Sequence, residues 1–219
     1  YRLSKREDMQ SNATCTPMSC GLPPALVHGS TLAKKKNVNY DTTLIKALNY
    51  SCNAGYSLNG RFGGATHQEI TCQDNGAFSA LQPCLPVSCG PPDAVGHSEA
   101  SPALQEVFFP QELMYTCDIG YATDSKANGE KQFETKCTEE GDLTEPKDCL
   151  PVECGTIRTV ENADYNKDKI WVYGEDAEIE CLDGFSTDKT TALAAALFTR
   201  SCQSNGKWTN EEVECKRIE

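Results

Sequence analysis

Histidine is scarce in this sequence, and that scarcity bears first on catalysis. Only His28, His67 and His97 are present, each in loop-like sequence, and none lies at a metal-ligand spacing such as His-Glu-x-x-His. No serine lies in a Gly-x-Ser-x-Gly motif, and the acidic stretches lack the spaced oxygen ligands of a calcium-binding loop. We therefore expect no catalytic residue, no cofactor, no metal site and no enzymatic activity.

Long apolar segments are absent as well. The longest candidate, residues 192–198, is far shorter than the roughly 18 residues that a membrane span needs. The sequence from Tyr1 onward shows no apolar core of a signal peptide. We expect no direct membrane insertion by this chain, and we expect its targeting and anchoring elements to lie outside the sequence or to have been removed.

Cysteine, in contrast, is abundant, and 12 of the 13 cysteines form three sets of four with nearly equal spacing. Successive cysteines of the three sets are 32, 20 and 12, then 28, 20 and 12, then 27, 21 and 13 positions apart. A period of about 65 residues that carries its own four thiols is typical of a tandem array. The sets are Cys20, Cys52, Cys72 and Cys84; Cys89, Cys117, Cys137 and Cys149; and Cys154, Cys181, Cys202 and Cys215.

The thirteenth cysteine, Cys15, lies five positions before Cys20, as the last cysteine of each set lies five before the next set. The intervening residues 16–19, 85–88 and 150–153 are similar linkers. We therefore interpret residues 1–19 as a tail and the remnant of an upstream module, and residues 20–84, 89–149 and 154–215 as three modules of a longer protein.

Modules of about 60 residues bury too little apolar surface to be stable without cross-links. Two disulfides that close loops of tens of residues contribute about 3–4 kcal/mol each in the chain-entropy account. The cysteines are numerous enough to bind metal, but their spacing is typical of extracellular disulfides. We expect a chain that is secreted or that lies on the extracellular face of a membrane, since cytosolic thiols stay reduced.

Alternating apolar and polar residues before the second cysteine of each module, as in residues 48–52, predict a strand with one buried face. The Gly-Tyr or Gly-Phe pairs that follow predict a turn and an aromatic ring in the core beside the disulfide. Asn75-Gly76 and Asn205-Gly206 are strong hairpin signals. Helix signals are scarce, and the pattern of short strands and long loops places the chain in the all-β class.

On these residues the chain resembles complement control protein modules, also called sushi or short consensus repeats. The Cys-Gly with Pro-Pro openings, the Tyr-x-Cys and Gly-Tyr steps and the Asn-Gly-x-Trp of residues 205–208 carry the resemblance over residues 20–215. Four cysteines alone allow three pairings. The resemblance implies small antiparallel β modules in an elongated array, with first-to-third and second-to-fourth disulfides: Cys20–Cys72, Cys52–Cys84, Cys89–Cys137, Cys117–Cys149, Cys154–Cys202 and Cys181–Cys215.

Two features depart from the family pattern. The family tryptophan is present as Trp208 but is replaced by Phe78 and Leu143 in the first two modules. Each module also has additional residues between its second and third cysteines, at residues 61–68, 124–131 and 187–197. The additions are interpreted as lengthened surface loops or as an extra hairpin or helical turn, and both departures favour a divergent lineage.

Charge differs between the modules. Lys and Arg number 5 against 3 Asp and Glu in residues 20–84, 4 against 13 in residues 89–149, and 6 against 12 in residues 154–215. The acidic modules disfavour nucleic acid as a partner and favour a basic protein, although solubility alone also accounts for them. The basic cluster Lys34, Lys35 and Lys36 is a candidate contact for sulfated glycans or an acidic protein, or else a solvated loop.

Two sequons are candidate glycosylation sites, Asn12 and Asn49, and Asn49 is expected to point outward because it alternates with Leu48 and Tyr50. Cys15 is expected to be unpaired in this chain, free, capped or joined adventitiously to another molecule, with a native intermolecular disulfide as the alternative. The proline-containing linkers are expected to restrict bending, with Leu85, Val87, Leu150 and Val152 packed between modules.

The resemblance implies protein–protein recognition or adhesion as part of a larger protein, with no active site. Members of the family include receptor ectodomains, selectins and apical proteins of parasites, and the divergent loops favour a parasite invasion or adhesion protein. The alternatives are a complement regulator that binds opsonins and the non-catalytic stalk of a protease.

Overall fold

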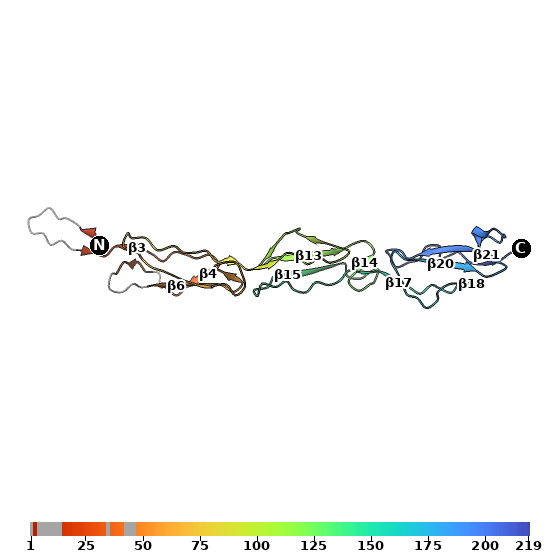
Figure 1. Ribbon diagram of the computed structural model, residues 1–219, viewed down its shortest axis with the longest axis horizontal. Coiled ribbons are helices and arrows are strands. Elements are labelled where there is room, and N and C mark those ends of the chain that lie inside the picture. Colours follow the sequence, from red (N-terminus) through yellow and green to blue (C-terminus); the bar gives the residue numbers. More distant parts are fainter. Residues whose placement is uncertain (1, 4–14, 34–35, 42–46) are drawn as a thin grey trace, which may run out of the picture. The chain divides into compact units, whose positions relative to one another are not determined.

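The computed structural model describes residues 2–3, 15–33, 36–41 and 47–219, and the side chains of all of these except Arg2, Leu3 and Cys15 (Figure 1). The described part is all-β, apart from one short 3-10 helix, η1 (Leu193–Ala195). Two compact units account for the chain. Unit 1 comprises Tyr1–Pro91, Gln105–Gln111 and Lys136–Thr144, and unit 2 comprises Pro92–Leu104, Glu112–Thr135 and Glu145–Glu219.

All three modules have the same topology, which consists of one three-stranded antiparallel sheet and two two-stranded sheets. In the first module, the central strand β6 (Leu48–Cys52) lies between β4 (Gly29–Thr31) and β8 (His67–Ile70). The small sheets pair β3 (Ser19–Gly21) with β5 (Val38–Asn39) and β7 (Tyr56–Ser57) with β9 (Leu85–Pro86). Before them, β1 (Arg2–Leu3) pairs with β2 (Cys15–Thr16).

The second and third modules follow the same topology with strands of similar length. The second module contains β10 (Ser88–Gly90), β11 (Ser98–Ser101), β12 (Val107–Phe108), β13 (Glu112–Cys117), β14 (Tyr121–Ala122), β15 (Gln132–Lys136) and β16 (Leu150–Pro151), which pairs with β14. The third contains β17 (Glu153–Gly155), β18 (Ala163–Asp164), β19 (Trp171–Val172), β20 (Asp176–Cys181), β21 (Phe185–Ser186), β22 (Leu197–Ser201) and β23 (Lys216–Arg217).

The central strands bury alternate residues, as their sequence pattern predicts. Tyr50 and Tyr115 are 1% and 2% exposed, and Ile179 takes the equivalent position in the third module. The Tyr50 hydroxyl donates to the Pro24 carbonyl oxygen at 2.7 Å, and the Tyr115 hydroxyl donates to that of Asp93 at 2.9 Å. Burial raises the pKa of both phenols, so these rings remain neutral donors inside the core.

Each module contains two disulfides, which join its first cysteine to its third and its second cysteine to its fourth. The pairs are Cys20–Cys72, Cys52–Cys84, Cys89–Cys137, Cys117–Cys149, Cys154–Cys202 and Cys181–Cys215. Bridges that span 32 to 52 positions each stabilise the fold by about 4 kcal/mol in the chain-entropy account. That stabilisation replaces what a large apolar core would provide in a bigger domain.

Two expectations from the sequence need revision. His67 begins strand β8 and does not lie in a loop. Leu85 and Leu150 are 43% and 42% exposed, so of the linker residues only Val87 and Val152 are buried. The leucines point outward because they lie in two-residue strands at the protein surface, where alternation sends neighbouring side chains to opposite faces.

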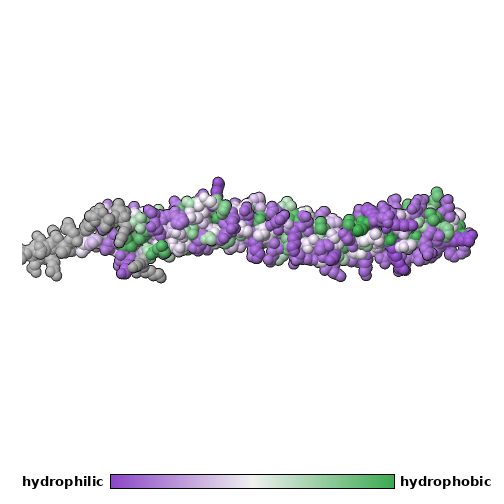
Figure 2. Space-filling view, turned by 90° about the horizontal axis from the view of Figure 1, so that it is seen from below, coloured by the Kyte–Doolittle hydropathy of each residue, from purple (hydrophilic) through white to green (hydrophobic). Residues whose placement is uncertain are grey.

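The face of the molecule that Figure 2 shows is mostly hydrophilic over the described part of the chain, and hydrophobic residues form small separate patches on it. The exposed large apolar side chains include Phe62, which is 65% exposed, and Leu193 in η1, which is 92% exposed.

The added segment of the third module, residues 187–197, contains the 3-10 helix η1. It therefore forms a helical turn, one of the two alternatives that its sequence allowed.

Candidate functional site

Unit 1 contains the junction at which the first module meets one end of the second. The linker residue Val87 is 3% exposed there. Its amide donates to the Gly55 carbonyl at 2.9 Å, and its own carbonyl accepts from the Phe109 amide at 2.9 Å. Val87 therefore ties a turn of the first module to a turn of the second through two main-chain hydrogen bonds.

Aromatic rings pack around this connection. The Tyr56 ring stacks on His28 with centroids 4.2 Å apart and planes at 9°, and it meets Phe109 edge-on at 5.7 Å and 88°. Gly55 makes the approach feasible, because a Cβ atom there would lie 2.3 Å from Cδ1 of Phe109. Gly55 also has a φ of +76°, which other residues adopt only with strain.

Unit 2 repeats this arrangement between the second and third modules. The Val152 amide donates to the Gly120 carbonyl and its carbonyl accepts from the Tyr173 amide, each at 2.8 Å. Tyr121 stacks on His97 at 3.9 Å and 11° and meets Tyr173 edge-on at 5.9 Å and 87°. Because the distances and angles recur, the junction is a feature of the repeat and not of one pair of modules.

The third module contains the first half of the same arrangement. The Ile218 amide donates to the Gly184 carbonyl at 2.9 Å, as Val87 and Val152 do at their glycines. Asn162, with a φ of +56°, takes the place of the two histidines. A Cβ atom on Gly184 would meet nothing within 4 Å among the described residues, so this glycine is uncovered.

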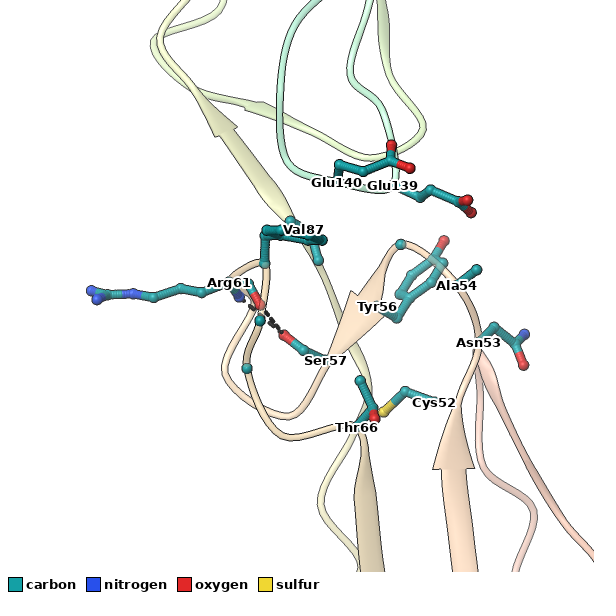
Figure 3. A pocket seen from close by; sticks show the side chains of 14 residues that line it. Cys52, Asn53, Ala54, Tyr56, Ser57, Arg61, Thr66, Val87, Glu139 and Glu140 are labelled. Carbon is teal, nitrogen blue, oxygen red and sulfur yellow. Dashed lines mark hydrogen bonds between the residues drawn. The ribbon is translucent and has the colours of Figure 1, made fainter.

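A cavity of about 380 Å³ opens beside the junction of unit 1 (Figure 3). The first module contributes the turn after β6, strand β7 and the loop that follows it, and the second module contributes an acidic turn. The lining residues are Cys52, Asn53, Ala54, Gly55, Tyr56, Ser57, Arg61, Phe62, Gly63, Gly64, Thr66, Val87, Glu139 and Glu140.

The loop after β7 is ordered by a buried hydroxyl. Ser57 is 2% exposed, and its Oγ accepts from the Arg61 amide at 3.0 Å and lies 2.9 Å from the Arg61 carbonyl oxygen. The Ser88 amide of the linker donates to the Gly60 carbonyl at 3.0 Å. Phe62 is held against the second module, since its Cβ lies 3.0 Å from where a Cβ on Gly141 would be.

Among the other candidate residues from the sequence, Asn49 and Lys36 do not line this cavity. Asn49 is exposed on β6, as its alternation predicts, and its glycosylation stays a prediction. Lys36 is exposed. Asn12, Lys34 and Lys35 and the side chain of Cys15 lie outside the described residues.

Two kinds of candidate site have no counterpart in the part of the chain that the structure describes. No group of three or more His, Cys, Asp or Glu side chains there could hold a metal ion. No helix in those residues is long and apolar enough to cross a membrane.

The burial of Val87 and Val152 in the linkers was predicted, but the aromatic residues of the junctions were not. The Gly-Tyr aromatics were expected beside the disulfides, whereas Tyr56 and Tyr121 lie half-buried at the junctions. A signal was present, because Phe109 and Tyr173 each lie eight positions before the second cysteine of their module. His28 and His97 were interpreted as loop residues without a role. No pattern in a single sequence predicts that they stack on tyrosine rings.

The chain is similar to proteins that contain one kind of repeat. Residues 20–84, 89–149 and 154–215 match the family described as Sushi repeat (SCR repeat). The chain is 30% identical over 210 residues to "Sushi, von Willebrand factor type A, EGF and pentraxin domain-containing protein 1" of Rattus norvegicus, covering 92% of this chain and 5% of that protein.

Two further relatives are similar over most of the chain. Complement factor H of Bos taurus is 25% identical over 186 residues, which cover 80% of this chain and 14% of that protein. Protein lev-9 of Caenorhabditis elegans is 27% identical over 234 residues, which cover 97% of this chain and 34% of that protein. The chain thus spans a small part of the length of the relatives it matches.

Proposed function

Because the chain belongs to the Sushi repeat (SCR repeat) family, we propose that it is an array of recognition modules that binds another protein outside the cell, as part of a larger secreted or surface protein. Six disulfides support this location, since they form and persist in oxidising compartments. We further propose that the chain acts by binding, without catalysis.

The observation that carries the proposal is the recurrence of the junction. Tyr56 with Phe109 and Tyr121 with Tyr173 have nearly the same ring geometry in units 1 and 2. A junction that is reproduced in this way holds the residues around it in fixed positions, which lowers the entropy that a binding surface loses when it engages a partner. The cavity of unit 1 lies beside one of these junctions.

A panel of purified extracellular proteins, arrayed and probed with the fluorescently labelled full chain, tests the proposal. We expect saturable binding to a small number of panel members, and we expect reduction and alkylation of the chain to abolish it. Absence of saturable binding across extracellular panels, or binding that survives reduction, would contradict recognition by folded modules.

The partner is proposed to be a basic protein. The second module has 4 Lys and Arg against 13 Asp and Glu, and the third has 6 against 12. The electric field of an acidic surface speeds association with a partner of opposite charge, and dissolved salt screens this field. The expected association rate therefore falls as the salt concentration rises, whereas a salt-independent rate would contradict a basic partner. A glycan contact at Lys36 of the first module stays a prediction.

Complement regulation is a second candidate because a relative over 80% of this chain is named Complement factor H. Binding of opsonic complement fragments to the immobilised chain tests it. The finer assignment as a parasite invasion or adhesion protein is supported by the lengthened loops and by Phe78 and Leu143 at the tryptophan positions. Saturable binding of the chain to host cells tests that assignment.

A further inference from the structure

The cavity of unit 1 has an aromatic side and an acidic side. The first module supplies Tyr56 and the exposed Phe62, and the second supplies Glu139 and Glu140. In Figure 3 the Tyr56 side chain points toward the turn that carries the two glutamates. Rings and carboxylates on one cavity are the two kinds of group that attract an organic cation.

The two carboxylates have no cation of their own among the described residues. Neither Glu139 nor Glu140 forms an ion pair or a side-chain hydrogen bond there. Arg61 also lines the cavity, but in Figure 3 its side chain extends away from both glutamates. The loop main chain at Arg61 is instead fixed by Ser57, which leaves the guanidinium free to remain in solvent.

We propose that this cavity binds a lysine or arginine side chain of the partner protein. The inference rests on the proposed function, because it takes the partner to be a protein. The cavity volume of about 380 Å³ is at the small end of ligand sites and suits one side chain better than a large ligand. Arginine is the preferred guest, since its planar guanidinium both pairs with carboxylates and stacks on aromatic faces.

The acidic turn is held at the cavity by the same contacts that form the junction. A Cβ on Gly141 would lie 3.0 Å from Cβ of Phe62 and 3.0 Å from Cγ1 of Val87, so the turn after Cys137 abuts the loop of the first module. Neither module alone provides both sides of the cavity. The binding of a cation at this place therefore depends on the junction as well as on the glutamates.

Short peptides with one variable residue test the inference on the full chain. Acetylated and amidated Gly-Gly-X-Gly-Gly peptides, with X as Arg, Lys or Gln, are titrated while the NMR resonances of the chain are followed. We expect weak binding of the Arg and Lys peptides, millimolar at best, because exposed ion pairs and one cation–π contact together supply no more than that affinity. The shifts should be confined to Tyr56, Phe62, Gly63 and the turn at residues 139–140, with no response to the Gln peptide.

Two charge-matched variants separate a site from general attraction. E139Q/E140Q should weaken binding of the Arg peptide about threefold or more. The control E99Q/E145Q removes two exposed carboxylates elsewhere in the same module and should leave binding unchanged. Phe62→Ala should also weaken binding of the Arg peptide, because it removes the aromatic ring from the cavity.

Several results would overturn the inference. Equal weakening in E139Q/E140Q and E99Q/E145Q, or shifts spread over the acidic modules, would show diffuse attraction. A response to the Gln peptide equal to that of the Arg peptide would show that charge has no part. If the chain binds an extracellular partner and E139Q/E140Q does not weaken that complex, the inference fails while the proposed function stands. If the Arg peptide binds at the cavity and no protein partner exists, the proposed function fails instead.

Discussion

Substitution of Gly120 by alanine should uncouple the third module from the second. The new Cβ would lie 2.1 Å from Cδ1 and 2.2 Å from Cε1 of Tyr173, whereas carbon atoms in contact are about 3.5–4.0 Å apart. The Tyr173 ring must therefore move by more than an ångström, which breaks its edge-on contact with Tyr121. Such aromatic pairs contribute about 0.5–1.5 kcal/mol beyond the area they bury.

The matched control is Gly90→Ala, in the same module. Gly90 has a φ of +81° against +88° for Gly120, so both variants bear a similar backbone cost of about 1–2 kcal/mol. A Cβ on Gly90 meets nothing within 4 Å among the described residues. Only the substitution at Gly120 reaches across to the third module, so the difference between the two variants isolates the packing at the junction.

Tryptophan fluorescence provides the assay, because the two tryptophans of the chain, Trp171 and Trp208, both lie in the third module. Urea unfolding followed by this signal reports the stability of that module. We expect Gly120→Ala to lower its free energy of unfolding by about 0.5–1.5 kcal/mol, and Gly90→Ala to leave it unchanged. Equal effects of the two variants on the tryptophan transition would refute the reasoning.

Three other outcomes are expected. Asp164 and Glu180 face each other directly across β18 and β20, so Glu180→Gln should stabilise the third module by about 0.2–1 kcal/mol in low salt; a gain that persists in high salt would contradict repulsion as the cause. The Lys169 ammonium, 2.9 Å away, and then the Val172 amide lower the pKa of Glu175. The stability that Glu175 contributes is therefore present above its unfolded pKa and is lost as pH falls through the lowered folded value; carbon-13 titration of this carboxyl at its ordinary pKa would contradict the contact. Cys117→Ser should remove the bridge to Cys149 and unfold the second module, at a cost of about 2–5 kcal/mol, while non-reducing peptide maps should still show the four disulfides of the other modules.

Local pattern was sufficient to predict the modules. The alternation around Tyr50 and Tyr115 places these rings in the core, and the residues at the tryptophan positions, Phe78 and Leu143, form the same bridges to Cys72 and Cys137 that Trp208 forms to Cys202. These features follow from period-two burial and from spacing to the cysteines, which one sequence displays.

The junctions could not be derived in this way. The sequence identifies Gly55 as a turn residue, and the turn requires its positive φ. The absence of a side chain at Gly55 also makes room for Phe109, which is more than 50 positions away in the sequence. The cavity has the same origin, since Phe62 and Glu140 come from different modules. Contacts between segments distant in sequence have no periodic signature, and they form only after each module has folded.

The central claim is that adjacent modules meet through one repeated contact between an aromatic ring and a Gly-Tyr turn. Nuclear Overhauser effects between ring protons of the full chain in solution test it most directly. We expect cross-peaks between Tyr56 and Phe109 and between Tyr121 and Tyr173, whose ring centroids are 5.7 and 5.9 Å apart. The stacked pair Tyr115 and Phe133, at 5.1 Å inside one module, serves as the internal standard. A cross-peak for that pair with none at either junction would contradict the account.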